Sequence, residues 1–396
     1  MLNFNMQEIT PKSKFFNSVY IMMGAMLHLC SVFFIPAFAF YTVIYHVSFL
    51  LVVQLFLMFL LGMTIPLFFF GYLSAFYNKR LVLVCALLMN ILVNVLSLLN
   101  SSFVLEIVLV FCSGIMCGVP VALVRHIDTL ANDWSINKLM YRGGVYVVSV
   151  FFCFVLGSLV FSFLPVAYLN IVQSLIMSFF IIVVLLDSRF TGLKKNKMSK
   201  FILVRFFYLV YYALANKNYR ASSIIFFCIY SYIVLLLLEI VSLNHSYGSR
   251  KFLLLCGATL LLLSCLSFKL VKYIPMSSVG LRNLTFVHLL LIVLMVIILH
   301  NNVLYLVLAL ASFAALYGPI AYSYSFKKGY TYVLKNTSIG MPMYVFMIVF
   351  LSMFTLQFLF SFFTDDLYRV VFWAITSAII ICVFNQLHLI YEKSNE

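Results

Sequence analysis

Long apolar stretches fill most of this 396-residue chain, and short polar segments separate them. A helix needs about 20 apolar residues to cross a bilayer, because each residue adds about 1.5 Å to its length. The first stretch is too long for a signal peptide and is expected to remain as the first helix. Twelve stretches predict membrane-spanning helices, at roughly residues 17–42, 50–72, 80–99, 103–124, 142–163, 166–186, 221–243, 252–272, 283–299, 303–325, 339–361 and 366–391.

The composition excludes an ordinary water-soluble enzyme. Hydrophobic residues make up 65% of the chain and charged residues 9%, whereas soluble domains have about 25% charged residues. One hydrophobic core stops growing near about 250–300 residues and could not absorb this much apolar surface. The sequence also has no phosphate-binding GxxxxGK[ST] loop, no metal-ligand spacing and no arrangement typical of a catalytic triad. We therefore predict a protein that is not an enzyme and has no cofactor and no metal.

The basic residues predict the orientation of the chain. The turns alternate between two faces, and 22 of the 25 lysines and arginines fall on one of them. Cytoplasmic turns carry this excess of positive charge, so that face is expected to be cytoplasmic. An even number of spans then places both termini there. The prediction is a multi-pass protein of the cytoplasmic (inner) membrane.

The longest polar interval divides the chain into two sets of six helices. Residues 1–186 form the first predicted half, residues 187–220 a basic cytoplasmic loop, and residues 221–396 the second half. Within the loop, 201–215 is apolar but short, which favours an interfacial helix. The net charge of +15 is explained by orientation and by contact with anionic lipid, so nucleic acid is not an expected partner.

A motif after the second predicted span carries a family resemblance. Residues 71–83 read GYLSAFYNKRLVL and resemble the loop signature of the major facilitator superfamily, G-x-L-x-D-R-x-G-R-R/K. Arg125, at the end of the fourth span, also resembles the family pattern. The flanking residues are similar to the Bcr/CflA-type branch of drug:proton antiporters. The matching loop positions are Gly71, Leu73, Lys79 and Arg80.

The resemblance implies twelve helices in two six-helix halves that work by alternating access, in a protein expected to be a monomer. A glycine at position 71 would let the second helix approach a neighbour closely. Lys79 and Arg80 would meet helix C-termini or anionic lipid headgroups, or they would only orient the helices.

The chain departs from the branch where protons are usually carried. Val32 stands where the resemblance implies an acid in the first helix, and Val110 stands where it implies an arginine in the fourth. Ala75 replaces the loop aspartate. These departures place proton antiport by the family's usual route in doubt.

Polar residues inside predicted spans are costly and become candidate functional residues. His28, in the first span, and Glu239, in the seventh, are candidates for proton coupling on helices that line the cavity by the resemblance. Their alternatives are a hydrogen bond between helices for His28 and a headgroup position for Glu239. Gln54, Tyr317 and Gln357 are candidates for substrate contact. Glu106 is expected at the membrane interface.

The favoured prediction is a secondary active transporter of small molecules that performs multidrug-type efflux, with protons as the coupling ion. One alternative is uptake or export of a small metabolite such as an amino acid or a siderophore. The other is a degenerate, non-transporting membrane receptor.

Overall fold

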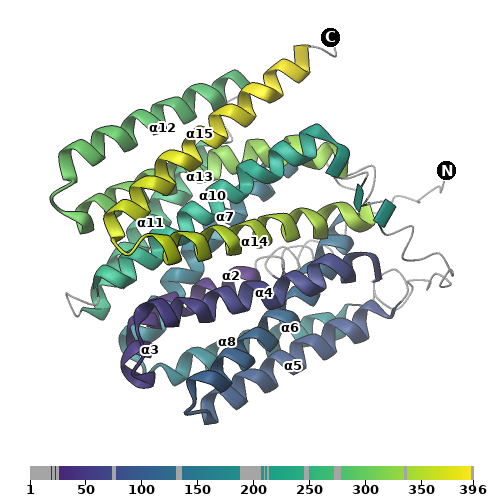
Figure 1. The fold of residues 1–396 in the computed structure, drawn as a ribbon. Coiled ribbons are helices and arrows are strands. Elements are labelled where there is room, and N and C mark those ends of the chain that lie inside the picture. The colour runs from purple at the N-terminus through teal and green to yellow at the C-terminus, as the bar shows by residue number, and fades with distance from the viewer. Residues whose placement is uncertain are drawn as a thin grey trace, which may run out of the picture.

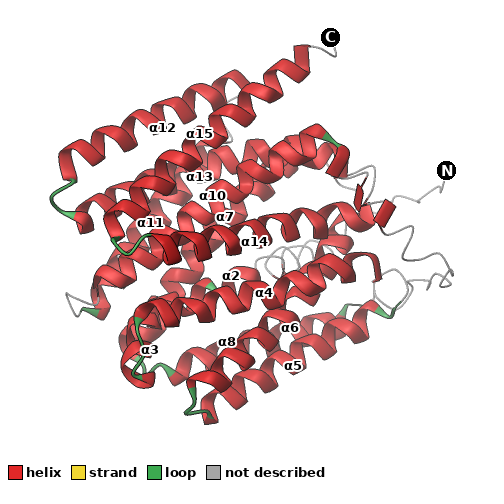
Figure 2. Cartoon of the chain, in the orientation of Figure 1, coloured by secondary structure: helices red, strands yellow, loops and turns green. Residues whose placement is uncertain are grey.

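The computed structural model is helical throughout the part of the chain that it describes (Figures 1 and 2). Twelve helical segments there are long and apolar enough to cross a membrane, which agrees with the twelve predicted spans. The described residues are 19, 23, 26–73, 77–130, 136–187, 207–208, 210–211, 214–244, 249–271, 278–333 and 337–393.

The two halves contain the elements that the apolar stretches predicted, with ends shifted by a few residues. The first half consists of α2 (Met26–Cys30), η1 (Val32–Ala37), α3 (Phe38–Tyr45), α4 (Phe49–Leu73), α5 (Lys79–Leu99), α6 (Phe103–Leu130), α7 (Ile136–Phe163) and α8 (Ala167–Leu186). The second half consists of α10 (Lys217–Asn244), α11 (Arg250–Val271), α12 (Ser278–Leu299), α13 (Val303–Val333), α14 (Thr337–Phe362) and α15 (Asp366–Lys393).

The first span differs from the single helix that the sequence predicted. It is divided into α2, the 3-10 helix η1 and α3, and Pro36 lies inside η1. Proline has no backbone N–H and clashes with the preceding turn, so an α-helix cannot continue through it undisturbed. A tighter 3-10 segment is a common form of such a break. The helical turns that contain His28 end at Cys30, and the 3-10 segment begins at Val32.

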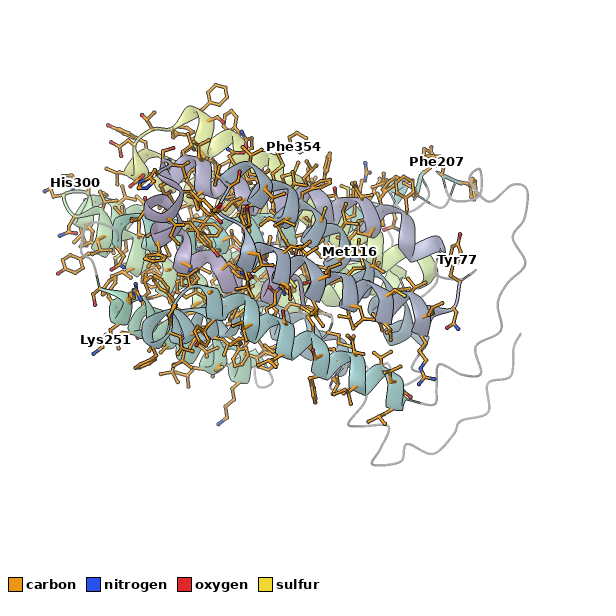
Figure 3. All side chains as sticks on the ribbon, turned by 90° about the horizontal axis from the view of Figure 1, so that it is seen from below. Tyr77, Met116, Phe207, Lys251, His300 and Phe354 are labelled. Atoms are coloured by element: carbon orange, nitrogen blue, oxygen red, sulfur yellow. The ribbon has the colours of Figure 1, made fainter. Side chains whose placement is uncertain are left out.

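The molecule has two distinguishable ends (Figure 3). Tyr77 lies toward the same end as Phe207, and Lys251 and His300 lie toward the opposite one. We call these the Tyr77 end and the His300 end. The predicted loop 187–220 lies largely outside the described residues, but α10 already begins at Lys217. Of the predicted interfacial helix 201–215, Val210 is buried against Met343.

The most extensive contacts between the halves run along three helix pairs. α4 packs against α14, and α7 packs against α11 and α13; α4 and α14 run side by side in Figure 1. α10 is the central helix of the second half. In the most apolar stretch of α10, 94% is buried inside the protein, compared with 22% in that of α12. A helix that is apolar all round and buried all round belongs in the interior of a bundle.

Two glycines bring α4 and α6 into backbone contact inside the first half. A Cβ atom added at Gly62 would lie 2.2 Å from the carbonyl oxygen of Phe111, and one added at Gly114 would lie 2.2 Å from the carbonyl oxygen of Phe59. The two sites are reciprocal, so the helices cross where neither has a side chain. Small residues permit such crossings in membrane bundles, where helix association depends on close packing.

Candidate functional site

His28 lies where the two halves meet. Its side chain is 4% exposed, and its ring centroid is 5.6 Å from that of Tyr230 on α10. The contact therefore joins the first span to the central helix of the other half. A titratable group at this position can respond to a change in the contact between the halves.

Aromatic residues connect the halves toward the Tyr77 end. The ring of Tyr146 on α7 lies 6.3 Å from that of Tyr322 on α13, and Phe68 on α4 lies 5.0 Å from Phe346 on α14. Tyr322 also contacts Phe226. These rings come from both sides of the interface, so the two halves are in contact at this end.

Arg250 connects the halves at the His300 end. Its guanidinium carbon lies 4.6 Å from the ring centroid of Phe161 and 5.3 Å from that of Phe40. The Ser162 hydroxyl donates to the backbone carbonyl of Arg250 at 3.1 Å. One residue at the start of α11 is thus held by α3 and α7 of the first half. Exposed cation–π contacts are weak, about 0.5–1 kcal/mol, so this contact can open without a large cost.

Glu239 is buried inside the protein and is not a free acid. The side chain is fully buried, and its Oε1 accepts a hydrogen bond from Arg369 Nε on α15 at 2.5 Å. Arg369 also donates to the carbonyl of Phe363 and to the carboxylate of Asp366. The candidate for proton coupling is therefore already paired with a cation in the same half. A buried pair of this kind is held together because either partner alone would be an uncompensated charge.

Tyr317 lies inside the second half. Its hydroxyl is 2.8 Å from the hydroxyl of Thr285, and its ring stacks on that of His288 at 4.5 Å. Both Tyr317 and His288 line a small cavity formed by α10, α12, α13 and α15. The structure therefore places this substrate-contact candidate within one half and in a polar cluster of its own.

The two glutamine candidates do not join His28. Gln54 is half-buried on α4. Gln357 is exposed on α14, and its Nε2 donates to the Ser361 hydroxyl at 3.3 Å. Phe354 and Phe358, on the same side of α14, are 54% and 44% exposed. The structure thus places Gln357 on an outward face together with large apolar side chains.

The loop motif lies at the Tyr77 end. Arg80 donates to the backbone carbonyl of Leu185 in the last turn of α8, a contact between a cation and a helix C-terminus. Asn78 caps α5, because its side chain accepts from the N–H groups of Arg80 and Leu81. Gly71 and Leu73 lie in the last turn of α4, Lys79 begins α5, and Arg125 lies in α6; their side-chain surroundings are outside the described part.

The structure also shows the surroundings of Val32 and Val110, two of the positions that depart from the family pattern. Val32 is fully buried in η1, and Val110 is half-buried on the wall of a cavity inside the first half. Glu106 lines the same cavity and is 5% exposed. Glu106 lies in the first turn of α6, and its side chain points into the bundle, where Ser97 and Asn100 hydrogen-bond to it. An interfacial depth for this residue stays a prediction.

Several residues that organise the structure were not predicted to do so. Arg369 and Arg250 entered the prediction only through the charge asymmetry between the two faces. A cation near the end of one span and an acid near the end of another span are nevertheless a weak sign of an ion pair. Gly157, on α7, is another such residue. An added Cβ there would lie 2.0 Å from the carbonyl oxygen of Phe33, so α7 crosses η1 at this glycine.

Among the described residues, no group of three or more His, Cys, Asp or Glu side chains could hold a metal ion. The described structure is therefore one of two packed halves with few buried charged or histidine side chains. His28 lies between the halves, Glu106 and Asp187 belong to α6 and the end of α8, and Glu239, His288 and Arg369 lie inside the second half.

Comparison with known proteins places the fold. No protein-family model matches the sequence, and no curated protein sequence matches it. Among solved structures, the chain is similar to the human organic anion transporter MFSD10 (TETRAN), with a TM-score of 0.58 and 16% identity. The likeness covers 96% of this chain and 99% of that one. The chain therefore has the all-α, twelve-helix fold of a major facilitator superfamily transporter.

Proposed function

We propose that the protein is a secondary transporter that moves small organic molecules across a membrane by alternating access. The observation that carries this proposal is the interface between the halves, which is held by separate contacts at its two ends. Aromatic rings form the contacts at the Tyr77 end, and Arg250 forms them at the His300 end. Rocking of two such halves exposes a site between them to one side of the membrane at a time.

The finer proposal is multidrug-type efflux, as in the Bcr/CflA-type branch that the loop motif resembles. Aromatic side chains form several of the described contacts between the halves, and aromatic surfaces accept varied apolar molecules. The similarity to an organic anion transporter supports an organic substrate. Val32 and Val110 favour a second candidate, transport of a small metabolite, because neither residue can carry a proton.

We further propose that the coupling ion is a proton and that His28 carries it. Its imidazole lies at the contact between the halves, while Glu239 is paired with Arg369. An imidazole can take up and release a proton, and the surroundings of His28 change when the contact between the halves opens.

The proposed orientation places the Tyr77 end in the cytoplasm of a cell with an inner membrane, with both termini there and with the protein as a monomer. The basic 187–220 interval would then meet anionic lipid. In a cysteine-free background, Asn301→Cys should react with an impermeant maleimide on intact cells, and Asn196→Cys should react only after lysis. The opposite pattern would reverse the orientation.

The transport proposal is tested by a reversible lock across the interface. Ser162→Cys and Arg250→Cys, combined in a cysteine-free protein, place two thiols on opposite halves at the Arg250 contact. A short, reducible thiol cross-linker should stop uptake of labelled organic substrates into proteoliposomes, and a reductant should restore it. Uptake that continues with the halves fully cross-linked would contradict alternating access.

The matched control places the same cross-link inside one half. Arg282 on α12 donates to Gln386 on α15 at 3.2 Å, so Arg282→Cys with Gln386→Cys cross-links helices that would move together. Transport should continue in this control.

Drug sensitivity of a strain that lacks the protein separates efflux from metabolite transport. If the protein performs efflux, the strain becomes more sensitive to drugs.

A further inference from the structure

A cavity inside the first half has a polar wall and an aromatic wall. Helices α5, α6 and α8 supply the polar side chains, while η1, α3 and α4 supply the aromatic ones. Its volume is about 50 Å³, and it is partly open to the outside of the molecule. The cavity lies toward the His300 end, since its residues come from the end of α3, the start of α6 and the start of α8. It does not belong to the interface between the halves.

Glu106 supplies the negative charge of this cavity. Its Oε1 accepts a hydrogen bond from the Ser97 hydroxyl at 2.6 Å, and its Oε2 accepts one from the Asn100 amide at 3.1 Å. Asn170 donates to the same Ser97 hydroxyl at 3.5 Å. No lysine, arginine or histidine is among the residues that line the cavity. The neutral donors orient the carboxylate, and its charge lacks a cation in the described part of the chain.

Gln173 adds an independent sign of a ligand. The side chain is fully buried and lines the cavity, and neither its amide nitrogen nor its amide oxygen has a hydrogen-bond partner in the described structure. A buried amide without partners is costly, so native proteins satisfy such groups with protein, water or ligand atoms. The polar wall therefore offers a donor and an acceptor that nothing within the described residues uses.

The opposite wall is aromatic. Phe38 and Tyr41, on α3, are 3% and 8% exposed, and Phe56 and Phe59, on α4, are both 2% exposed. Aromatic faces attract organic cations, most strongly where water is excluded. A carboxylate opposite aromatic rings therefore selects a compound with a positive charge and an apolar body. An anion would find no cationic partner here, and a metal ion would find only one carboxylate.

We propose that this cavity binds an organic ammonium compound, with the ammonium group beside Glu106 and the apolar part against Phe56 and Phe59. The site lies within one half and so does not depend on the transport cycle proposed above. Binding can therefore be measured without transport, and failure of either proposal leaves the other standing.

The test uses the full chain in phosphatidylcholine nanodiscs and isothermal titration calorimetry. Benzyltrimethylammonium is the probe, and neopentylbenzene, in which carbon replaces the nitrogen, is its neutral isostere. Empty nanodiscs correct for partition into lipid. We expect saturable binding of the cation and binding of the isostere that is at least about tenfold weaker, because a charge-assisted contact is lost. No saturable binding of the cation, or equal binding of the isostere, would overturn the proposal.

Two variants locate the site. Glu106→Gln keeps the shape of the side chain and should weaken cation binding at least about tenfold. Val110→Phe should remove binding by filling the cavity. Val108 lies on the same helix and is 51% exposed, so Val108→Phe should leave binding unchanged. Unchanged binding in Glu106→Gln would overturn the proposal, even if Val110→Phe fails to fold.

Gln173→Leu separates a ligand contact from a packing role. The change removes an unsatisfied buried amide at nearly constant volume, so the variant should be at least as stable as the wild type. It should nevertheless bind the cation more weakly. A variant that binds the probe as tightly as the wild type would show that Gln173 does not face the ligand and would overturn the two-wall arrangement.

Discussion

Each half carries one buried glutamate toward the His300 end, and the two glutamates have opposite surroundings. Glu239, in the second half, is ion-paired with Arg369. Glu106, in the first half, accepts only neutral donors and faces a cavity. The difference shows that a buried charge in a membrane bundle is not by itself a functional site. Glu239 fastens α10 to α15, whereas the charge of Glu106 remains available to a ligand.

The largest expected effect is on the ion pair. Arg369→Ala would leave Glu239 buried without a cation, which should cost about 3–5 kcal/mol of unfolding free energy. Glu106→Gln should cost about 1.5 kcal/mol or less, because it removes a buried charge that no cation compensates and keeps one oxygen as an acceptor for the nearby donors. Both values can be measured by denaturant unfolding in micelles. Replacing the pair together, as Glu239→Met with Arg369→Leu, should recover most of the loss. Equal losses for Arg369→Ala and Glu106→Gln would remove the contrast between the two acids.

The next largest effect is a difference between Gly114, in the first half, and Gly318, in the second, in the unfolding free energy lost when each is replaced by alanine. A Cβ at Gly114 would lie 2.2 Å from the backbone oxygen of Phe59, whereas one at Gly318 would lie 3.2 Å from side-chain carbons of Ile233 and Val147. A backbone oxygen is fixed by its helix and cannot move away from the added methyl group, whereas the end of a flexible side chain can. Gly114→Ala should therefore cost about 1–3 kcal/mol of unfolding free energy, and Gly318→Ala less than about 1 kcal/mol. Unfolding curves that rank the two in the reverse order would contradict the close crossing of α4 and α6.

Among the described residues, His28 and His288 are buried, and they extend the comparison to transport. His28 lies between the halves, and His288 is stacked on Tyr317 inside the second half. With one proton exchanged per substrate, one pH unit can drive about tenfold accumulation, or about 1.4 kcal/mol. His28→Ala should abolish pH-driven accumulation in proteoliposomes and spare substrate exchange, which moves no net proton. His288→Ala should keep both. Accumulation that survives in His28→Ala would assign coupling to another group or another ion.

The smallest expected effect concerns the contact at the His300 end. Arg250→Ala removes the cation–π contacts with Phe40 and Phe161 and a long hydrogen bond of 3.5 Å to the Phe161 carbonyl. Exposed cation–π contacts are worth about 0.5–1 kcal/mol, so we expect a shift of at least about two- to fivefold in the balance between closed and open forms. Maleimide labelling of Ser162→Cys, in a cysteine-free background, reports this balance. Arg282→Ala, which removes a contact inside one half, is the control and should leave the labelling rate unchanged. A similar change in both variants would indicate a general loosening instead.

Much of the fold could be predicted from the sequence, but little of the site. The ends of α6 and α13 extend beyond the predicted spans, because a helix continues past the hydrocarbon core where its turns stay favourable. The first span was predicted as continuous, although Pro36 signals a break. Glu239 was predicted as a candidate for proton coupling or as a headgroup residue. Its partner Arg369 lies 130 residues away, and no local pattern identifies such a partner.

The sequence by itself determined the number, length and order of the spans. These follow from local hydropathy, since a backbone in lipid must satisfy its own hydrogen bonds as a helix. Only the tertiary structure decided which face of each helix points inward, which glycines lie at crossings, and which glutamate has a cation. Lipid tails and the protein interior are both apolar, so an apolar sequence does not mark its inward face. The partners of Glu106, Glu239 and Gln173 are therefore fixed by packing between distant segments.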